Sequence, residues 1–177
     1  MLRKILIALG VIIAVVLVAA AFQPADFQVS RSTLISAPPA ALFAEVNDLQ
    51  RWKTWSPYEK LDPAMKRTFA GPPAGVGAAY GWEGNSQSGT GQMTITESQP
   101  AEKVVIRLDF LKPMEATSYA TFRFAPEGSQ TRVTWSMAGH NGYLGKLFCM
   151  FMNMDKMVGA QFEEGLATLK ANAEKKG

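Results

Sequence analysis

Helical spacing is clearest in residues 144–169, with the sequence LGKLFCMFMNMDKMVGAQFEEGLATL. Apolar residues recur there at steps of three and four: Leu144, Leu147, Phe148, Phe151, Met154, Val158, Phe162, Leu166 and Leu169. This spacing predicts one helix of about seven turns with a single apolar face. Phe and Met dominate the first half of that face, and thioether side chains adapt to irregular neighbours, including bound ligands. The helix is therefore expected to pack on a sheet, either as ordinary core or around a hydrophobic cavity.

Strand-like alternation of apolar and polar residues fills the middle of the chain, as in an antiparallel sheet with one covered face. It occurs in residues 66–70, 77–83, 89–97, 103–110, 116–124 and 131–138. A further strand is predicted at residues 27–36, followed by two short helices within residues 40–56. A curved sheet that grips the last helix is the simplest arrangement that covers all these apolar faces.

The amino terminus carries an apolar run, residues 5–22, which follows Arg3 and Lys4 and contains no charge. As a helix this run spans about 27 Å, close to the thickness of a hydrocarbon core. We expect residues 1–22 to be an uncleaved membrane anchor and residues 23–26 a linker. The positive charges ahead of the run predict a cytoplasmic amino terminus and a domain outside the cytoplasm, periplasmic in a Gram-negative cell. The alternative is a cleaved signal peptide and a secreted domain, because Ala19–Ala21 supplies the small residues of a cleavage site.

Charge and reactive residues exclude several kinds of site. Eighteen lysines and arginines stand against fifteen acidic residues, without a basic cluster that would follow phosphates, so nucleic-acid binding is not expected. Cys149 and His140 are the only residues of their types, which argues against a disulfide or a zinc site. His140 stands at a strand end without a nominated nucleophile. We therefore predict no catalytic residue, no metal and no cofactor. Asp155 is expected to point outward and pair with a lysine.

Several motifs resemble those of one protein superfamily. They are Ile35–Pro38, residues 47–57 with Trp52 and Trp55, residues 75–77 and 82–85, residues 89–95, Thr134–Met137 and Met154–Met157. In these motifs the chain resembles helix-grip proteins of the START / Bet v 1-like (SRPBCC) superfamily, and more closely the bacterial polyketide cyclase/dehydrase type. The resemblance implies an α+β helix-grip domain over residues 27–173, with a curved antiparallel sheet of about seven strands around a long C-terminal helix.

Such domains typically hold an apolar pocket between the sheet and the terminal helix, so the resemblance implies one here. The expected lining is Tyr80, Trp82, Met93, Ile95, Phe110, Phe122, Trp135 and Met137 from the sheet, with Phe151 and Met154 from the helix. A tryptophan that faces inward needs a partner for its indole N–H. The alternative is a filled core without usable volume.

Three functions are compatible with this sequence. The leading hypothesis is a membrane-anchored, non-enzymatic domain that binds a lipid-like or polyketide-like small molecule. The second is an enzyme of the polyketide cyclase/dehydrase kind, which requires a polar group in the pocket. The third is a module that binds a protein partner through an exposed segment containing Trp52 and Trp55.

Overall fold

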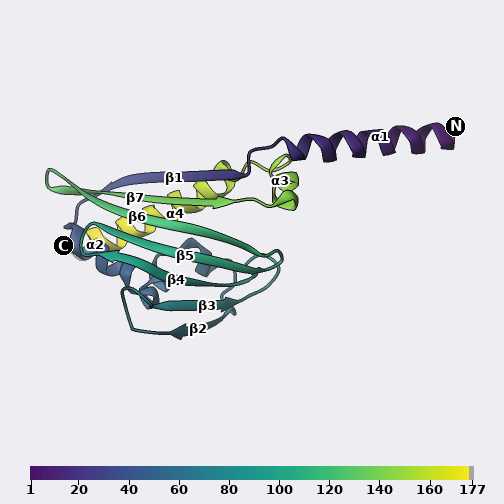
Figure 1. Ribbon diagram of the computed structural model, residues 1–177. Helices are drawn as coiled ribbons and strands as arrows, with labels where there is room; N and C mark the ends of the chain where they lie inside the picture. Colours follow the sequence, from purple (N-terminus) through teal and green to yellow (C-terminus); the bar gives the residue numbers. More distant parts are fainter. Residues whose placement is uncertain (176–177) are drawn as a thin grey trace.

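The computed structural model describes residues 1–175, and its domain is a single antiparallel sheet curved around helices (Figure 1). The strands are β1 (Asp26–Ile35), β2 (Lys66–Ala70), β3 (Ala79–Glu83), β4 (Thr90–Gln99), β5 (Lys103–Lys112), β6 (Ala116–Glu127) and β7 (Gln130–His140). Their order across the sheet is β1-β7-β6-β5-β4-β3-β2, so β1 closes one edge by pairing with β7. The α+β helix-grip fold with seven strands, which the sequence predicts, is confirmed.

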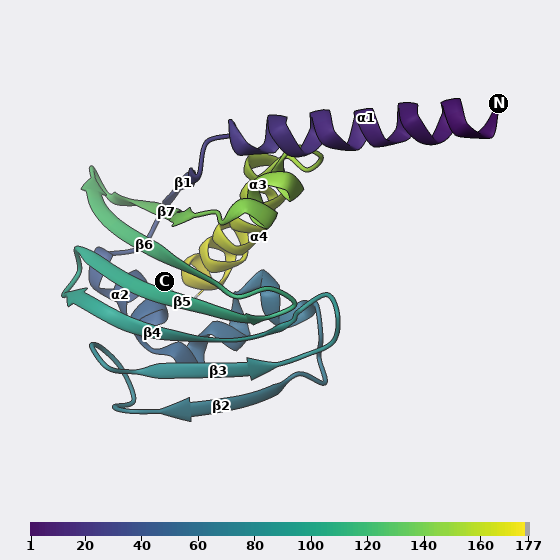
Figure 2. The same ribbon diagram turned by 45° about the vertical axis from the view of Figure 1, so that its right-hand side comes forward.

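The helices lie at three places around this sheet (Figures 1 and 2). They are α1 (Leu2–Ala21), α2 (Pro39–Asn47), the 3₁₀ helices η1 (Leu49–Thr54) and η2 (Pro57–Lys60), α3 (Tyr143–Cys149) and α4 (Met154–Glu174). Helix α1 extends away from the domain, and α3 lies beside it. Helices α2, η1, η2 and α4 cover the concave face of the sheet.

The single helix predicted over residues 144–169 is wrong, because α3 and α4 are separated by a break at residues 150–153. Asn153 begins the second helix, and its side-chain oxygen accepts the backbone N–H of Lys156 at 2.9 Å. An asparagine that caps a helix in this way favours a new start over continuation. Apolar residues continue at steps of three and four across the break, so the sequence pattern did not reveal that the chain changes direction there.

Helix α4 packs on the inner face of the sheet through Val158, Phe162, Leu166 and Leu169, all buried. Trp135 of β7 stacks on Phe162 of α4 with ring centroids 4.1 Å apart, and on Phe122 of β6 at 4.8 Å. Trp52 and Trp55 from the η1 segment meet this stack edge-on. A cluster of five aromatic rings therefore fills the space between η1, α4 and the strands β6 and β7.

The Trp52/Trp55 segment is part of this core and does not form the exposed surface that the partner-binding hypothesis requires. Trp52 and Trp55 are only 4% and 1% exposed. Their indole N–H groups donate to the backbone carbonyls of Val46 and Glu45, at 2.9 and 3.2 Å. Both rings are thus buried, and both indole N–H groups have hydrogen-bond acceptors within the domain.

An arginine clasp holds α4 against β1. The guanidinium of Arg31 donates to both carboxylate oxygens of Asp155 at 3.0 Å and to Glu163 Oε1 at 2.6 Å. A Cβ at Gly159 would overlap this guanidinium, so the absence of a side chain at Gly159 leaves room for Arg31 to cross the surface of α4. The hydrogen bond from Arg31 lowers the pKa of Asp155. Asp155 thus pairs with an arginine of β1, whereas the sequence suggested a neighbouring lysine.

Gly165 of α4 is expected to be indispensable for the aromatic stack. A methyl group there would come within 2.8 Å of the Trp135 ring and 2.9 Å of the Pro57 ring, both held in the core. Alanine is favoured over glycine in a helix by about 1 kcal/mol, whereas overpacking costs about 1–3 kcal/mol. We expect Gly165→Ala to lower the free energy of unfolding by up to about 2 kcal/mol, which is the overpacking cost less the helix preference of alanine, measured by urea denaturation.

Gly142→Ala is the control for this prediction, because a methyl group at Gly142 meets nothing within 4 Å. Gly142 is the N-cap of α3, where alanine is disfavoured, so the substitution is expected to cost at most about 1 kcal/mol through weaker capping and nothing through overpacking. A stabilising Gly165→Ala substitution would contradict the close packing described here.

Candidate functional site

The ten residues predicted to line a pocket occupy three different environments. Six are buried in the core: Tyr80, Met93, Ile95, Phe122, Trp135 and Met137. Trp82, Phe110 and Met154 are half-buried at the edge of that core. Phe151 lies in the turn between α3 and α4 and is 73% exposed, so the structure does not bring it to the sheet. Its predicted place on the inner face followed from the wrong assumption of one continuous helix.

Trp82 and Phe110 form the accessible end of the aromatic lining. Their ring centroids are 5.9 Å apart in an edge-to-face arrangement. The Trp82 ring lies over Gly91 of β4, where a Cβ would come within 2.5 Å of it. The indole N–H of Trp82 donates to the carbonyl of Ser88 in the β3–β4 hairpin at 3.1 Å. This tryptophan therefore has the polar partner that an inward-facing indole needs.

Trp135 differs, because its buried indole nitrogen has no acceptor among the residues that the structure describes. The side-chain oxygen of Gln161, next to Phe162 on α4, is likewise buried and unpaired within residues 1–175. A buried polar group left without a partner costs about 1–3 kcal/mol. The indole nitrogen of Trp135 and the side-chain oxygen of Gln161 are therefore a donor and an acceptor that the described residues leave unpaired.

The Tyr58 ring lies edge-on beside that of Trp135, with ring centroids 6.4 Å apart. Burial raises the pKa of its hydroxyl, yet 37% of the residue surface is accessible. Tyr58 is therefore partly exposed next to the buried ring of Trp135. We call the accessible apolar residues Tyr58, Trp82, Phe110 and Met154 the inner margin.

A polar cluster that the sequence analysis missed adjoins the inner margin. Glu59 of η2 accepts the Tyr80 hydroxyl at 2.7 Å and the Arg67 guanidinium at 2.7 Å, and its side chain is 11% exposed. Burial, followed by the hydrogen bond to Glu59, raises the pKa of Tyr80. Glu59 belongs to a 3₁₀ helix of four residues, which is too short for a periodic pattern to reveal.

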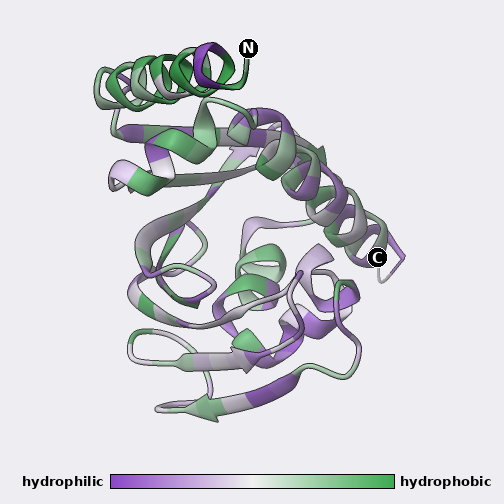
Figure 3. Ribbon diagram, turned by 90° about the vertical axis from the view of Figure 1, so that its right-hand side faces the viewer, coloured by the Kyte–Doolittle hydropathy of each residue, from purple (hydrophilic) through white to green (hydrophobic). Residues whose placement is uncertain are grey.

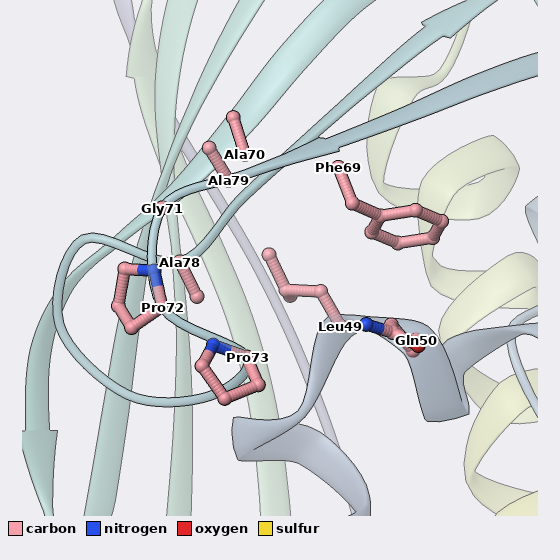
Figure 4. Close-up of a pocket in the computed structure, with 9 residues that line it drawn as sticks. All are labelled: Leu49, Gln50, Phe69, Ala70, Gly71, Pro72, Pro73, Ala78 and Ala79. Carbon is pink, nitrogen blue, oxygen red and sulfur yellow. The ribbon is translucent and has the colours of Figure 1, made fainter.

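The structure also contains a cavity of about 280 Å³ away from the predicted lining (Figure 4). It lies between η1 and the β2–β3 loop and is lined by Leu49, Gln50, Phe69, Ala70, Gly71, Pro72, Pro73, Ala78 and Ala79. Gln50 is the one polar side chain among these, so the cavity offers little with which to orient a ligand. A second hollow, of about 380 Å³, follows the β5–β6 hairpin and reaches Phe110 of the inner margin.

The residues that the structure describes contain no metal-binding group, and the histidine lies at the end of the sheet. Within residues 1–175 no three His, Cys, Asp or Glu side chains are grouped as metal ligands would be. His140 Nδ1 lies 2.8 Å from Asp26 Oδ1, where β1 and β7 meet at the end of the sheet, and both side chains are largely exposed. The Glu59 cluster, by contrast, contacts the predicted lining directly, because Glu59 accepts the hydroxyl of Tyr80.

Comparisons with known proteins agree with this architecture. Residues 26–174 match a family model described as "Polyketide cyclase / dehydrase and lipid transport". No curated protein matches the chain in sequence. A solved structure from Chromobacterium violaceum is 14% identical, with a TM-score of 0.61 over 83% of this chain and 96% of its own. One from Nitrosospira multiformis is 17% identical, with a TM-score of 0.61 over 85% of this chain and all of its own.

A third similar structure is the di-domain ARO/CYC StfQ from the steffimycin biosynthetic pathway. It is 11% identical, with a TM-score of 0.67, and the match covers 86% of this chain and 52% of StfQ. At such identities these structures show a shared fold alone.

Alkaline conditions are expected to destabilise the domain through Tyr80. Its raised pKa means that the unfolded chain loses the phenol proton first, from about pH 10. The contribution to stability is therefore complete below about pH 10 and is lost as the pH rises toward the raised pKa. We expect Tyr80→Phe to reduce the fall in unfolding free energy above about pH 10 by about 1.4 kcal/mol per pH unit, measured by urea denaturation.

The control is Tyr119→Phe, which removes a phenol that is 48% exposed on β6. The same pH slope in Tyr80→Phe as in the unmodified chain would contradict the assignment of the effect to Tyr80.

Proposed function

This chain belongs to the polyketide cyclase / dehydrase and lipid transport family, and on that premise we propose that it binds a lipid-like or polyketide-like small molecule on the inner face of its sheet. The proposal depends most on the buried, unpaired indole N–H of Trp135 beside the accessible ring of Tyr58. The inner margin supplies apolar contact area, while Trp135 and Gln161 supply a donor and an acceptor. A few polar groups among apolar walls are typical of sites that hold apolar ligands in one orientation.

The remaining predicted lining residues stand behind the inner margin in this proposal. Tyr80, Met93, Ile95, Phe122 and Met137 are buried and pack in one core with Trp135. They support the rings of the margin and fix the depth to which a ligand enters. Trp135 faces Phe122 and Val104 in the register, six residues along β5 from Phe110, so in this proposal the ligand reaches from Phe110 and Met154 at the end of the sheet toward Trp135.

A membrane anchor is the second part of the proposal. Helix α1 is long and apolar enough to cross a membrane by length and composition, and nearly all of it is exposed. Figure 3 shows it hydrophobic along its length except in the turn next to the amino terminus, which contains Arg3 and Lys4. Because positive charges remain on the cytoplasmic side, we place the domain on the opposite side of the membrane. A family described by lipid transport is consistent with a ligand drawn from that membrane.

An enzyme is the alternative function, and the Glu59 cluster favours it. Glu59 accepts a hydrogen bond from the hydroxyl of Tyr80. The ring centroids of Tyr80 and Trp82 are 6.3 Å apart. A phenol held beside a carboxylate can donate or accept a proton. The carboxylate is, however, already paired with Arg67, and this pairing suits a structural role equally well.

Ligand retention by the full chain tests the binding proposal. We expect native mass spectrometry of the chain, released from its own membranes, to show one retained apolar molecule. Trp82→Ala and Phe110→Ala are each expected to reduce the retained fraction at least tenfold, since a ring buried against a ligand contributes about 1.5–3 kcal/mol. A change in the mass of the retained molecule that disappears in Glu59→Gln would favour the enzyme.

The matched control for retention is Phe69→Ala. Phe69 is an aromatic residue of a neighbouring strand, 48% exposed and stacked on Tyr80, but it lies at the cavity of Figure 4 and outside the inner margin. A bare unmodified chain, or equal retention in all four proteins, would refute the proposed site.

The topology of the anchor is tested with single cysteines in a Cys149→Ser background. We expect a membrane-impermeant maleimide to label Val76→Cys from outside intact spheroplasts and to label Leu2→Cys only after permeabilisation. We also expect carbonate-washed membranes to retain the chain at full length. Release of a shortened chain would show signal cleavage, and the reverse labelling pattern would show the opposite orientation.

A further inference from the structure

Helix α3 and the turn after it expose an apolar surface that the domain leaves uncovered. It consists of Tyr143, Leu144, Phe148, Phe151 and Met152, which we call the α3 surface. Leu144 and Phe151 are 65% and 73% exposed. Contiguous exposed apolar residues of this kind mark sites of interaction with a protein or a membrane.

The α3 surface is joined directly to the end of α1. The Tyr143 hydroxyl donates to the carbonyl of Leu17 at 2.6 Å. The Lys146 ammonium lies 3.4 Å from the carbonyl of Ala21, the last residue of α1. Both views of the ribbon show α3 beside the domain-facing end of α1 (Figures 1 and 2). Helix α3 is therefore held at the depth of the last turn of α1.

That depth corresponds to the membrane interface if α1 crosses a bilayer. A helix of 20 residues is about 30 Å long, which matches a hydrocarbon core. Leu17 precedes the end of α1 by about one turn, or about 6 Å along the axis. Tyr143 and Phe148 would then lie where aromatic residues concentrate in membrane proteins. Lys146 suits the same level, because its cation lies at the negative end of the α1 dipole and its stem is apolar.

A second apolar tip lies at the same end of the sheet. Leu111 and Met114 of the β5–β6 hairpin are 53% and 43% exposed. The register places this hairpin next to the end of β7, since Phe110 pairs with Ala116 and Ser118 with Gly139. Figures 1 and 2 show the hairpin at the end of the domain from which α1 extends.

We propose that the α3 surface and the tip formed by Leu111 and Met114 dock on the bilayer that α1 crosses. This inference rests on the anchor proposed above. It commits to lipid as the partner because the surface is continuous with α1, the most apolar element of the chain. Phe110 directly precedes the tip, and Met154 follows the α3 surface by two residues. Docking therefore brings the inner margin to the lipid, and an apolar ligand passes between them without crossing water.

The test measures the membrane depth of single labelled sites in the full chain. The chain, in a Cys149→Ser background, is reconstituted in vesicles of phosphatidylethanolamine and phosphatidylglycerol and labelled with an environment-sensitive NBD dye. Phe151→Cys and Leu111→Cys report on the docking surface. Val76→Cys is the matched control, an apolar residue 59% exposed in the β2–β3 loop at the opposite end of the sheet.

We expect dyes at positions 151 and 111 to emit at shorter wavelength, to lose quenching by aqueous iodide and to be quenched by spin-labelled lipid. The dye at position 76 is expected to remain open to iodide. Equal iodide quenching at all three positions would overturn the docking proposal. Leu144→Cys replaces Phe151→Cys if circular dichroism shows that the latter is unfolded.

Carbonate washing and flotation of the same vesicles separate the two proposals. If the chain floats but the dye at position 151 is in water, docking is refuted and the anchor stands. If the chain is released from the vesicles, the anchor is refuted and docking is refuted with it. Ligand retention is measured independently of both results.

Discussion

The stacking of Trp135 on Phe122 and Phe162 is the contact on which the rest of the domain depends. It joins β7 to β6 and to α4, and the rings of Trp52 and Trp55 close around it from η1. Large aromatic rings supply most of the buried apolar area at such a junction. The cluster is possible only because Gly165 leaves room on α4. Within residues 1–175 the Trp135 indole N–H has no acceptor, so the residue at the centre of this packing also carries the unpaired donor of the proposed site.

The position of α4 follows from two polar contacts at its beginning. Asn153 starts the helix, and Arg31 holds its first three turns against β1 through Asp155 and Glu163. With α4 packed mainly over β1 and β7, the strands from β3 to β5 are covered by shorter elements, of which η2 contributes Tyr58 and Glu59. The half-buried state of Trp82 and Phe110 is the consequence. The inner margin is therefore a result of where the arginine clasp places the helix.

Sequence patterns predicted the sheet well, because each strand has one covered face and its alternation records that face directly. They failed where the information lies in contacts between distant residues. The period of 3.6 residues says nothing about direction, so α3 and α4 read as one helix although Asn153 is a good capping residue. Arg31 lies on the same face of β1 as Val29 and Ile35, but its acidic partners are more than a hundred residues away. The Trp52/Trp55 pair has helical spacing in either a buried or an exposed segment, and only the fold shows that it is buried.

Phe151, which the sequence analysis placed in the pocket, instead belongs to an exposed apolar surface next to α1. The Phe- and Met-rich half of the segment was expected to face the sheet, as ordinary core or as the wall of a cavity, and the break at residues 150–153 instead leaves Phe148, Phe151 and Met152 exposed in α3 and the turn after it. Exposed apolar residues beside an aqueous phase lower solubility and favour association. Here they adjoin the last turn of α1 through Tyr143, and an anchor of that length brings its last turn to the lipid surface. One segment thus supplies two apolar surfaces, α4 toward the sheet and α3 toward the membrane. The turn between them leads from the α3 surface to Met154, the first residue of the inner margin on α4.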